Sequence, residues 1–191
     1  MNVLEAIKER RTIRRFDEDK KISLDIVKNL VSLGRLAPSA ANLQPWEFII
    51  VNDRQKCEEI FPYLKWAGYL APKGTPCKGE RPVSYIILIA NPEINKDFQH
   101  DFGAVAQNIM LSAHSIGIGS CWMSAIDRDQ IRRILNVPLG YQIDTLIALG
   151  YPKEKPIIEE AKDSIKYYKD REGRLHIPKK VLEKITHIDK W

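Results

Sequence analysis

The chain has 191 residues, of which 44% are hydrophobic and 29% are charged, a composition typical of one globular domain with a full core and not of a disordered or fibrous protein. The formal net charge of +5 permits weak attraction to any polyanion but identifies none. The longest apolar run, Ile86–Ala90, is far short of a membrane span, and the residues after Met1 lack the apolar core of a secretory signal, so we expect a cytoplasmic protein without membrane association.

Helices and strands are predicted along roughly the first 150 residues, because apolar residues recur there at periods of about 3.6 or 2. Ser23, Asp53 and Asp127 stand where helix N-caps are needed, and Gly34 or Pro38 ends the second helix. The predicted elements are, in chain order, helix 3–10, helix 24–34, strand 47–51, helix 54–64, strand 83–90, helix 98–117, a short strand at 121–123, helix 128–135 and strand 142–149. This order predicts an α+β or α/β sandwich of few strands.

Two of these elements are predicted to be buried. Residues 83–90 are apolar almost without interruption, like a strand covered on both faces. The helix at 98–117 is apolar nearly all round, so it should lie at the centre of the domain. In a domain of this size we also expect that helix to pack on a partner subunit.

Two segments are predicted to have no core of their own. Glycines and prolines recur through residues 65–82, which predicts a loop or a mobile flap. From Pro156 onward the chain is charged, with isolated apolar residues, so the C-terminal extension (155–191) should lie over the rest of the chain or over a partner. Residues 1–191 are together expected to form one domain.

The segment Arg10-Arg11-Thr12-Ile13-Arg14 places four polar side chains just beyond the first helix. Guanidinium groups match phosphate oxygens in bidentate fashion and the Thr12 hydroxyl adds a donor, so this turn would bind a terminal phosphate. A solvated basic turn is the alternative. Alternation along the segment would place Ile13 in the core and leave Thr12 and Arg14 on the other side.

The stretch Ala37-Pro38-Ser39-Ala40-Ala41-Asn42-Leu43-Gln44-Pro45-Trp46 is a polar loop that leads directly into a strand. Its uncharged hydroxyl and amide groups, on Ser39, Asn42 and Gln44, can donate and accept hydrogen bonds, which suits the edge of a flat ring rich in heteroatoms. A loop built only from Asx and Ser turns is the alternative.

A third stretch, from Gly117 to Ala125, lies between the buried helix and the next capped helix. Its glycines would let the backbone approach a planar ligand and direct N–H groups at it, although a tight helix-to-strand connection explains them equally. The stretch lacks the context of the dinucleotide fingerprint, which follows a strand and opens a helix. No histidine stands near Cys121 in sequence to make it a nucleophile.

The sequence shows no motif for metal binding, nucleophilic catalysis or nucleic-acid binding. Three cysteines and four histidines show neither metal-ligand spacing nor a disulfide framework. Ser39 and Ser120 lack the context of a nucleophile elbow, and no Walker motif occurs. Nucleic-acid binding would need a denser basic stripe with interleaved aromatic residues.

Taken together, four stretches resemble the nitroreductase family of FMN-dependent oxidoreductases. They are residues 7–16, residues 37–46, Asp101 to Trp122, and Ala148-Leu149-Gly150-Tyr151-Pro152. Each is weak evidence alone, but their order and spacing cover most of the first 152 residues. The resemblance implies an α+β fold, an α-β-α sandwich that forms an intertwined homodimer, with the C-terminal arm packing on the partner subunit and two FMN sites at the subunit interface.

The resemblance also implies which residues hold the flavin. The arginine-rich turn would hold the FMN phosphate, and the 38–42 loop would reach the same flavin from the other subunit. The stretch after the glycines would lie along the flavin ring, with a backbone N–H near Ser124 facing N5, and a basic residue of the tail would complete the phosphate site. The residues concerned are Arg10, Arg11, Thr12, Arg14, Pro38, Ser39, Ala40, Asn42, Cys121, Trp122, Met123, Ser124, Lys179 and Lys180.

On this resemblance we expect an FMN-dependent oxidoreductase that transfers hydride from NADH or NADPH through flavin N5 to a small oxidised acceptor. A nitroaromatic, a quinone or free flavin would serve as acceptor in a ping-pong cycle that needs no catalytic side chain. Two alternatives stay open. One is a specialised flavoenzyme on the same scaffold, such as a reductive dehalogenase, and the other is a flavin-free basic protein that binds an anionic partner.

Overall fold

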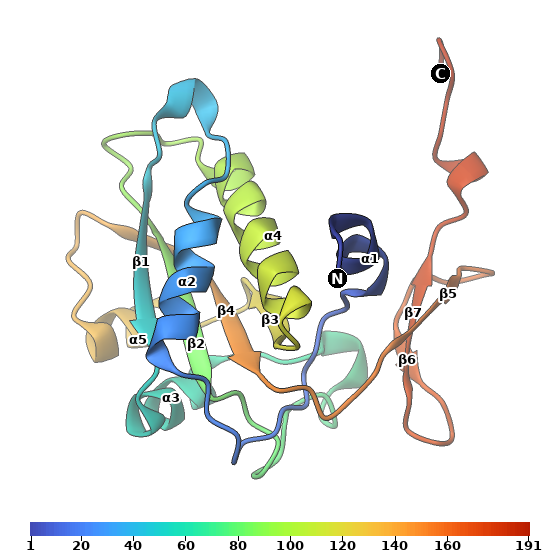
Figure 1. Cartoon of the computed structure of the whole chain (residues 1–191), viewed down its shortest axis with the longest axis horizontal. Helices are drawn as coiled ribbons and strands as arrows, with labels where there is room; N and C mark the ends of the chain where they lie inside the picture. The colour runs from blue at the N-terminus through green and yellow to red at the C-terminus, as the bar shows by residue number, and fades with distance from the viewer.

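The computed structural model of the chain describes residues 1–191, and its body is built on one antiparallel sheet (Figure 1). The strands lie in the order β1-β2-β4-β3, and every neighbouring pair is antiparallel. They are β1 (Trp46–Val51), β2 (Ser84–Ala90), β3 (Gly119–Met123) and β4 (Gln142–Gly150). The strands predicted for the body are confirmed, and their antiparallel pairing makes the fold α+β and not α/β.

Helices cover both faces of this sheet, so the body has three layers. The helices are α1 (Val3–Glu9), α2 (Leu24–Gly34), α3 (Arg54–Ile60), α4 (Gln99–Ser115) and α5 (Arg128–Leu135). One core lies between the sheet and α2 with α4, and the other lies between the sheet and α3 with α5. Strand β2 sends Ile86 and Leu88 into the first core and Ile87 and Ile89 into the second, which is why its apolar run is unbroken.

Three helices begin where the sequence predicts. The side chains of Ser23, Asp53 and Asp127 each accept a hydrogen bond from a backbone N–H three residues further on. α3 is shorter than predicted, because it ends at Ile60 and the chain continues as a single 3₁₀ turn. Pro62 causes this change, since it has no N–H to donate to the helix.

α4 lies at the centre of its layer, as its apolar surface predicts. Phe102, Val105, Ala106 and Ile109 are fully buried along it. α2 crosses α4 closely at Gly34, where an added Cβ would lie 2.6 Å from Cγ1 of Ile109. The two helices can pack at this distance only because position 34 has no side chain.

The C-terminal tail forms a small sheet that the sequence analysis did not predict. β5 (Ile157–Glu160), β6 (Tyr168–Lys169) and β7 (Leu175–Lys179) pair in the order β5-β7-β6. This sheet stands beside the body, and the last residues run away from both (Figure 1). Apolar residues are too sparse in the tail to show a period of two, so no strand pattern could be recognised there.

None of the helices combines the length and the apolar character needed to cross a lipid bilayer. The structure gathers no group of three or more His, Cys, Asp or Glu side chains that could hold a metal ion. Cys57, Cys77 and Cys121 are free thiols.

Candidate active site

The arginine-rich turn (residues 10–14) leaves α1 and runs beside the first residues of β3. Thr12 and Ser120 form an isolated parallel β-bridge. In the same contact the Ile13 N–H donates a hydrogen bond to the Ser120 carbonyl at 2.9 Å. Ile13 is buried whereas Thr12 is half buried, as the alternation predicts. The arginine-rich turn can lie this close to β3 because position 119 is glycine: an added Cβ there would lie 2.9 Å from Cγ1 of Ile13.

The turn concentrates the positive charge of three arginines within five residues. None of the guanidinium groups of Arg10, Arg11 and Arg14 takes part in a salt bridge. Burial, and next the neighbouring charge of Arg11, lower the pKa of the Arg10 guanidinium, and burial also lowers the pKa of Arg11. The Nε atom of Arg14 is buried and has no hydrogen-bond partner. An anion with several oxygens would stabilise such a cluster.

Further polar atoms beside the turn lack partners. Ser120 Oγ and His114 Nε2 are buried without a hydrogen bond. Burial lowers the pKa of the His114 imidazole, Glu9 opposes the shift, and Arg10 and Arg11 add to it, so the ring is held neutral. The sequence analysis did not assign His114 to the site. Its position in the last turn of α4, beside the glycine stretch that the sequence analysis did assign to the site, was the signal available in the sequence.

The 38–44 loop holds a strained conformation at the start of α4. Ala41, Asn42 and Gln44 have positive φ angles of 47°, 57° and 49°, a region that residues other than glycine enter at a cost of about 1–3 kcal/mol. The Oγ of Ser39 accepts a hydrogen bond from the Gln44 N–H at 3.0 Å. Ser39 therefore shapes the loop while its own hydroxyl proton stays free to donate.

α4 separates this loop from the arginine-rich turn. The Ala40 N–H donates to Oδ1 of Asp101 in the first turn of α4, whereas Nη1 of Arg10 lies 4.0 Å from Sδ of Met110 further along the helix. From Asp101 to Met110 the helix rises by about 14 Å. Within one chain the structure therefore does not bring the two predicted groups together.

The stretch after the glycines forms β3 and the turn that follows it. Cys121 and Met123 are buried in the core, so only their backbone groups could contact a ligand, and their assignment to the site stays a prediction. Trp122 and Ser124 are exposed, and the Trp122 indole N–H donates to Thr145 Oγ1 at 2.8 Å. Burial raises the pKa of the Cys121 thiol to about 11, which keeps it protonated and inert.

The base of the tail contacts the arginine-rich turn. The backbone N–H groups of Arg14 and Arg15 both donate to Oε1 of Glu154. The Arg14 guanidinium lies over the Tyr167 ring, 4.9 Å from its centroid. The sequence analysis missed both Glu154 and Tyr167, although a pair of tyrosines in a charged tail was a usable signal for the second.

Lys179 and Lys180, the predicted phosphate ligands of the tail, lie at and just beyond the end of β7. Both are exposed. No hydrogen bond or ion pair joins either side chain to the arginine-rich turn of the same chain, so their assignment stays a prediction.

Residues 65–82 form the predicted loop, and it is anchored to the site. The Arg15 guanidinium pairs with Glu80 at 3.0 Å. The Lys65 N–H donates to the Ala125 carbonyl at 3.0 Å. The loop therefore lies beside the end of β3, where it can form a wall of the candidate site.

The fold is an α+β sandwich, in which an antiparallel sheet lies between two helical layers. At its β3 edge lies a cationic turn whose guanidinium groups form no ion pair, which suits an anionic ligand. The model of the Nitroreductase family matches residues 7–151, which include the sheet, α2 to α5 and the arginine-rich turn. The chain belongs to the nitroreductase family.

Individual relatives agree with this assignment. A protein of Archaeoglobus fulgidus, whose name places it among the NADH dehydrogenases/NAD(P)H nitroreductases, is 32% identical over 171 residues, 84% of this chain and 91% of that protein. The structure of an FMN-dependent nitroreductase from Clostridium difficile has a TM-score of 0.70 and 27% identity, covering 98% of this chain and 99% of that one. A relative from Thermotoga neapolitana, 26% identical over 164 residues (77% of this chain, 87% of that protein), is named iodotyrosine deiodinase.

Proposed function

We propose that the chain is an FMN-dependent oxidoreductase whose arginine-rich turn holds the flavin phosphate. One observation carries the proposal: the guanidinium groups of Arg10, Arg11 and Arg14 are half buried, and none of them forms an ion pair with a carboxylate. A phosphate dianion supplies the missing charge and accepts bidentate hydrogen bonds. The hydroxyl of Thr12, a half-buried residue of the same turn, is a further donor.

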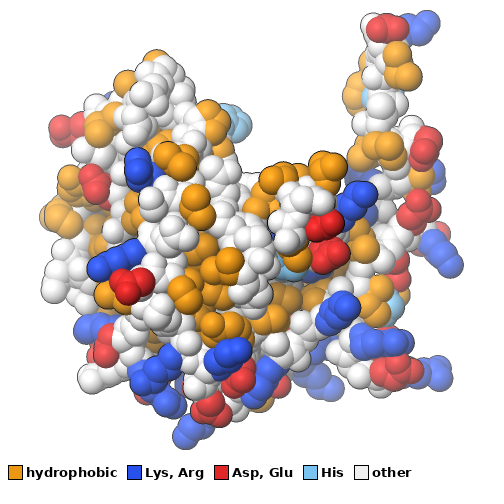
Figure 2. Space-filling view, in the orientation of Figure 1, with side chains coloured by type: hydrophobic (Ala, Val, Ile, Leu, Met, Phe, Trp, Pro, Cys, Tyr) orange, Lys and Arg blue, Asp and Glu red, His pale blue; other side chains and the backbone are white.

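A homodimer would complete the site, because the 38–44 loop cannot reach the turn of its own chain. The loop would instead contact the flavin that the partner's turn holds, through Pro38, Ser39, Ala40 and Asn42. α1 exposes Val3, Leu4 and Ile7, and Figure 2 shows apolar side chains gathered over α1 and the neighbouring part of the body. An exposed apolar patch of this kind supports a subunit interface.

The tail would pack on the partner subunit in the same dimer. Its last residues expose large apolar side chains that find no cover within one chain, namely Leu182, Ile185, Ile188 and Trp191. In such a dimer Lys179 or Lys180, at the end of β7, would add a cation to a phosphate site.

The chemistry that FMN supplies when bound is hydride transfer, first from NADH or NADPH and then to a small oxidised acceptor such as a nitroaromatic, a quinone or free flavin, in ping-pong order. The chain's own residues bind and orient the reactants. Trp122 and Ser124 offer an exposed surface at the end of β3, where a backbone N–H near Ser124 would face the flavin ring. The buried Cys121 thiol takes no part, since it stays protonated.

The purified protein provides the test. It should be yellow, should release stoichiometric FMN on denaturation, and should bleach on anaerobic addition of NADH or NADPH and regain colour with an acceptor. A colourless protein that takes up no added FMN would reject the proposal. If that colourless protein bound polyanions in a salt-sensitive manner, a flavin-free basic binding protein would replace it.

Reductive dehalogenation is the second candidate, favoured by the name of the Thermotoga relative. It would use the same flavin site, with residues 65–82 as part of the substrate pocket. Iodide release from an iodinated phenol by the reduced protein would support it. Rapid reduction of quinones without any iodide release would exclude it.

A further inference from the structure

Tyr167 of the tail joins segments that are far apart in the chain. The Arg14 guanidinium of the arginine-rich turn lies over its ring, 4.9 Å from the centroid. The ring of Tyr69, in the 65–82 loop, packs on the Tyr167 ring with the centroids 4.9 Å apart and the planes at 52°. The Tyr69 N–H also donates to the Tyr167 hydroxyl at 3.4 Å. The loop therefore holds the ring that contacts Arg14.

The side chain of Arg14 donates no hydrogen bond within the chain, unlike those of its neighbours in the turn. The Arg11 guanidinium donates to the carbonyls of Lys8 and Arg10. Nη1 of Arg10 lies 4.0 Å from Sδ of Met110. Nε of Arg14 is buried without a partner, whereas its two Nη nitrogens are not buried and have no partner in the chain. The N–H groups of both Nη nitrogens are thus free to donate to a ligand.

The contacts around Arg14 restrain it without occupying these donors. The Glu154 carboxylate accepts from the backbone N–H groups of Arg14 and Arg15, and it forms no ion pair with the Arg14 guanidinium. The face of the Tyr167 ring attracts the cation through its π system, and it does not neutralise the positive charge as a carboxylate would. The ring therefore orients Arg14 and leaves its charge available to an anion.

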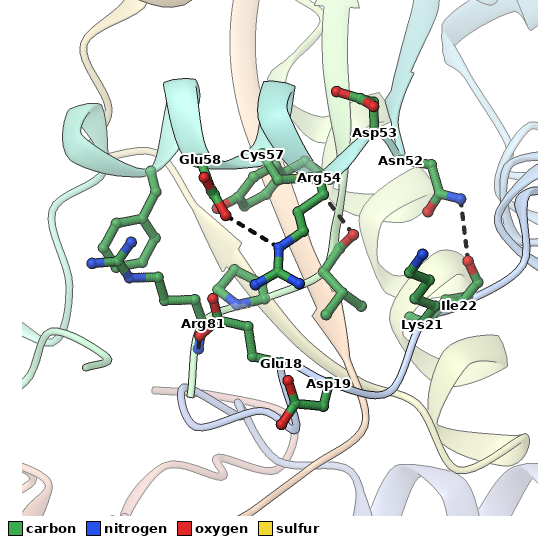
Figure 3. A pocket seen from close by; sticks show the side chains of 14 residues that line it. Glu18, Asp19, Lys21, Ile22, Asn52, Asp53, Arg54, Cys57, Glu58 and Arg81 are labelled. Atoms are coloured by element: carbon green, nitrogen blue, oxygen red, sulfur yellow. Dashed lines mark hydrogen bonds and ion pairs between the residues drawn. The ribbon is translucent and has the colours of Figure 1, made fainter. Parts of the chain in front are cut away.

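A second arginine of the chain also lies over an aromatic ring, in different surroundings. The Arg81 guanidinium is 4.4 Å from the centroid of the Phe61 ring. The pocket beside it carries both signs of charge, from Glu18, Asp19, Lys21, Asp53, Arg54 and Glu58 (Figure 3). An anion in that pocket would meet several carboxylates. Contact with a ring therefore does not by itself define an anion site, whereas free donors among neighbouring arginines support one.

We propose that Tyr167 is a positioning residue of the flavin phosphate site, whose ring holds the Arg14 guanidinium where both Nη nitrogens can donate to the phosphate. This inference rests on the proposed function. Because Tyr69 packs on the same ring, the 65–82 loop supports the phosphate site through Tyr167. The tail then contributes an aromatic ring to the phosphate site of its own chain.

FMN and riboflavin are a matched pair of probes, because riboflavin lacks only the phosphate. Quenching of flavin fluorescence gives both dissociation constants. We expect Tyr167→Leu, which removes the ring, to lower the ratio of the riboflavin constant to the FMN constant at least about three-fold. Tyr167→Phe keeps the ring and should keep the wild-type ratio. Tyr168→Leu is the control in the same tail, because Tyr168 stacks on His176 and not on Arg14, and it should also keep the ratio.

Arg14→Ala separates positioning from a general structural role. If Tyr167 acts through Arg14, Tyr167→Leu should change the ratio in the wild type and leave it unchanged in Arg14→Ala protein. A structural role would instead weaken both flavins in both backgrounds. Tyr167 lies outside the two cores of the body, so we expect Tyr167→Leu to fold, and its thermal unfolding checks this.

Several outcomes would overturn the inference and leave the FMN assignment intact. They are a wild-type ratio in Tyr167→Leu, a reduced ratio in Tyr167→Phe, and an equal effect of Tyr167→Leu with and without the Arg14 side chain. A wild-type protein that takes up no FMN would reject the proposed function, and this inference with it.

Discussion

The Ala40 N–H donates to the buried carboxylate of Asp101 at 3.1 Å, and this is the single hydrogen bond that joins residues 38–44 to another part of the chain. The second carboxylate oxygen, Oδ2, is buried without a partner. Several residues of the loop have positive φ angles, which residues other than glycine rarely adopt. The intrinsic backbone preferences of these residues would therefore not maintain the conformation of the loop. Asp101 therefore fixes the position of the loop against the first turn of α4.

Asp101→Ala should raise the dissociation constant of FMN at least about ten-fold, because a hydrogen bond to a charged group contributes about 1.5–3 kcal/mol. Asp101→Asn keeps an acceptor oxygen and should fall between the alanine variant and the wild type. Gln107→Ala changes the exposed side of the same helix and should have no effect. Quenching of flavin fluorescence measures the three constants, and unaltered binding by Asp101→Ala would show that the loop is not held by this contact.

Arg10→Ala combined with Arg14→Ala should yield a folded protein that purifies without FMN, since two charged contacts to phosphate are removed at once. We expect a loss of affinity of about 100-fold or more. Riboflavin lacks the phosphate and should bind wild type and variant alike. Arg54→Ala, which removes an exposed arginine paired with Glu58, serves as the control. Full flavin occupancy in the double variant would remove the phosphate assignment.

Asn42→Ala should weaken FMN binding while leaving any dimer intact. Position 42 has a φ of 57°, so alanine removes the amide and also adds backbone strain. Asn42→Gly removes the amide without that strain and separates the two effects. Flavin titration and light scattering measure the outcome. Wild-type affinity in Asn42→Gly would reduce Asn42 to a residue that only forms the turn.

Gly119→Ala should destabilise the body by about 1–3 kcal/mol, because the new methyl group would overlap Ile13 and push the arginine-rich turn away from β3. Gly103→Ala is the matched control on α4, where an added Cβ meets nothing within 4 Å. The control should be neutral or more stable by up to about 1 kcal/mol. Urea unfolding measures both, and equal midpoints would contradict the close packing of Ile13 on Gly119.

His176 connects all parts of the tail sheet. From β7 its ring contacts Glu159 of β5 at 2.9 Å and Asp170, just beyond β6, at 3.2 Å, and it stacks on Tyr168. Arg174 pairs with the same Asp170 carboxylate at 2.7 Å. Hydrogen bonding to Glu159, followed by that to Asp170, raises the pKa of His176 above its ordinary value of 6.5.

The tail sheet should therefore loosen as pH rises. The raised pKa means that the protonated ring favours the folded sheet, so this stabilisation is complete below about pH 6.5 and is lost as pH passes the raised value. Hydrogen exchange of the β7 amides, corrected for the intrinsic rate, should show falling protection above about pH 6.5 in the wild type. His176→Gln should show lower protection that does not change with pH. A pH-independent wild type would contradict the prediction.

Local patterns were sufficient for most elements of the body. The apolar run of β2, the cap residues before three helices and the apolar surface of α4 each act within a few residues, so their outcome follows from nearby chemistry. The strands of the tail could not be predicted from local patterns. For example, β6 has only two residues and is a strand only because it pairs with β7. The positive φ angle of Ala41 could not be predicted either, because alanine is not a residue that favours this conformation in turns.

The sequence by itself determined which chemical groups are present in the protein. These are a run of arginines after a short helix, an uncharged polar loop, and apolar residues at the periods of helices and strands. Tertiary structure decided which of these groups meet. It placed Asp101 against Ala40 and Arg14 against Tyr167. Such contacts join residues far apart in the chain and depend on strand register and helix packing, which no local pattern encodes.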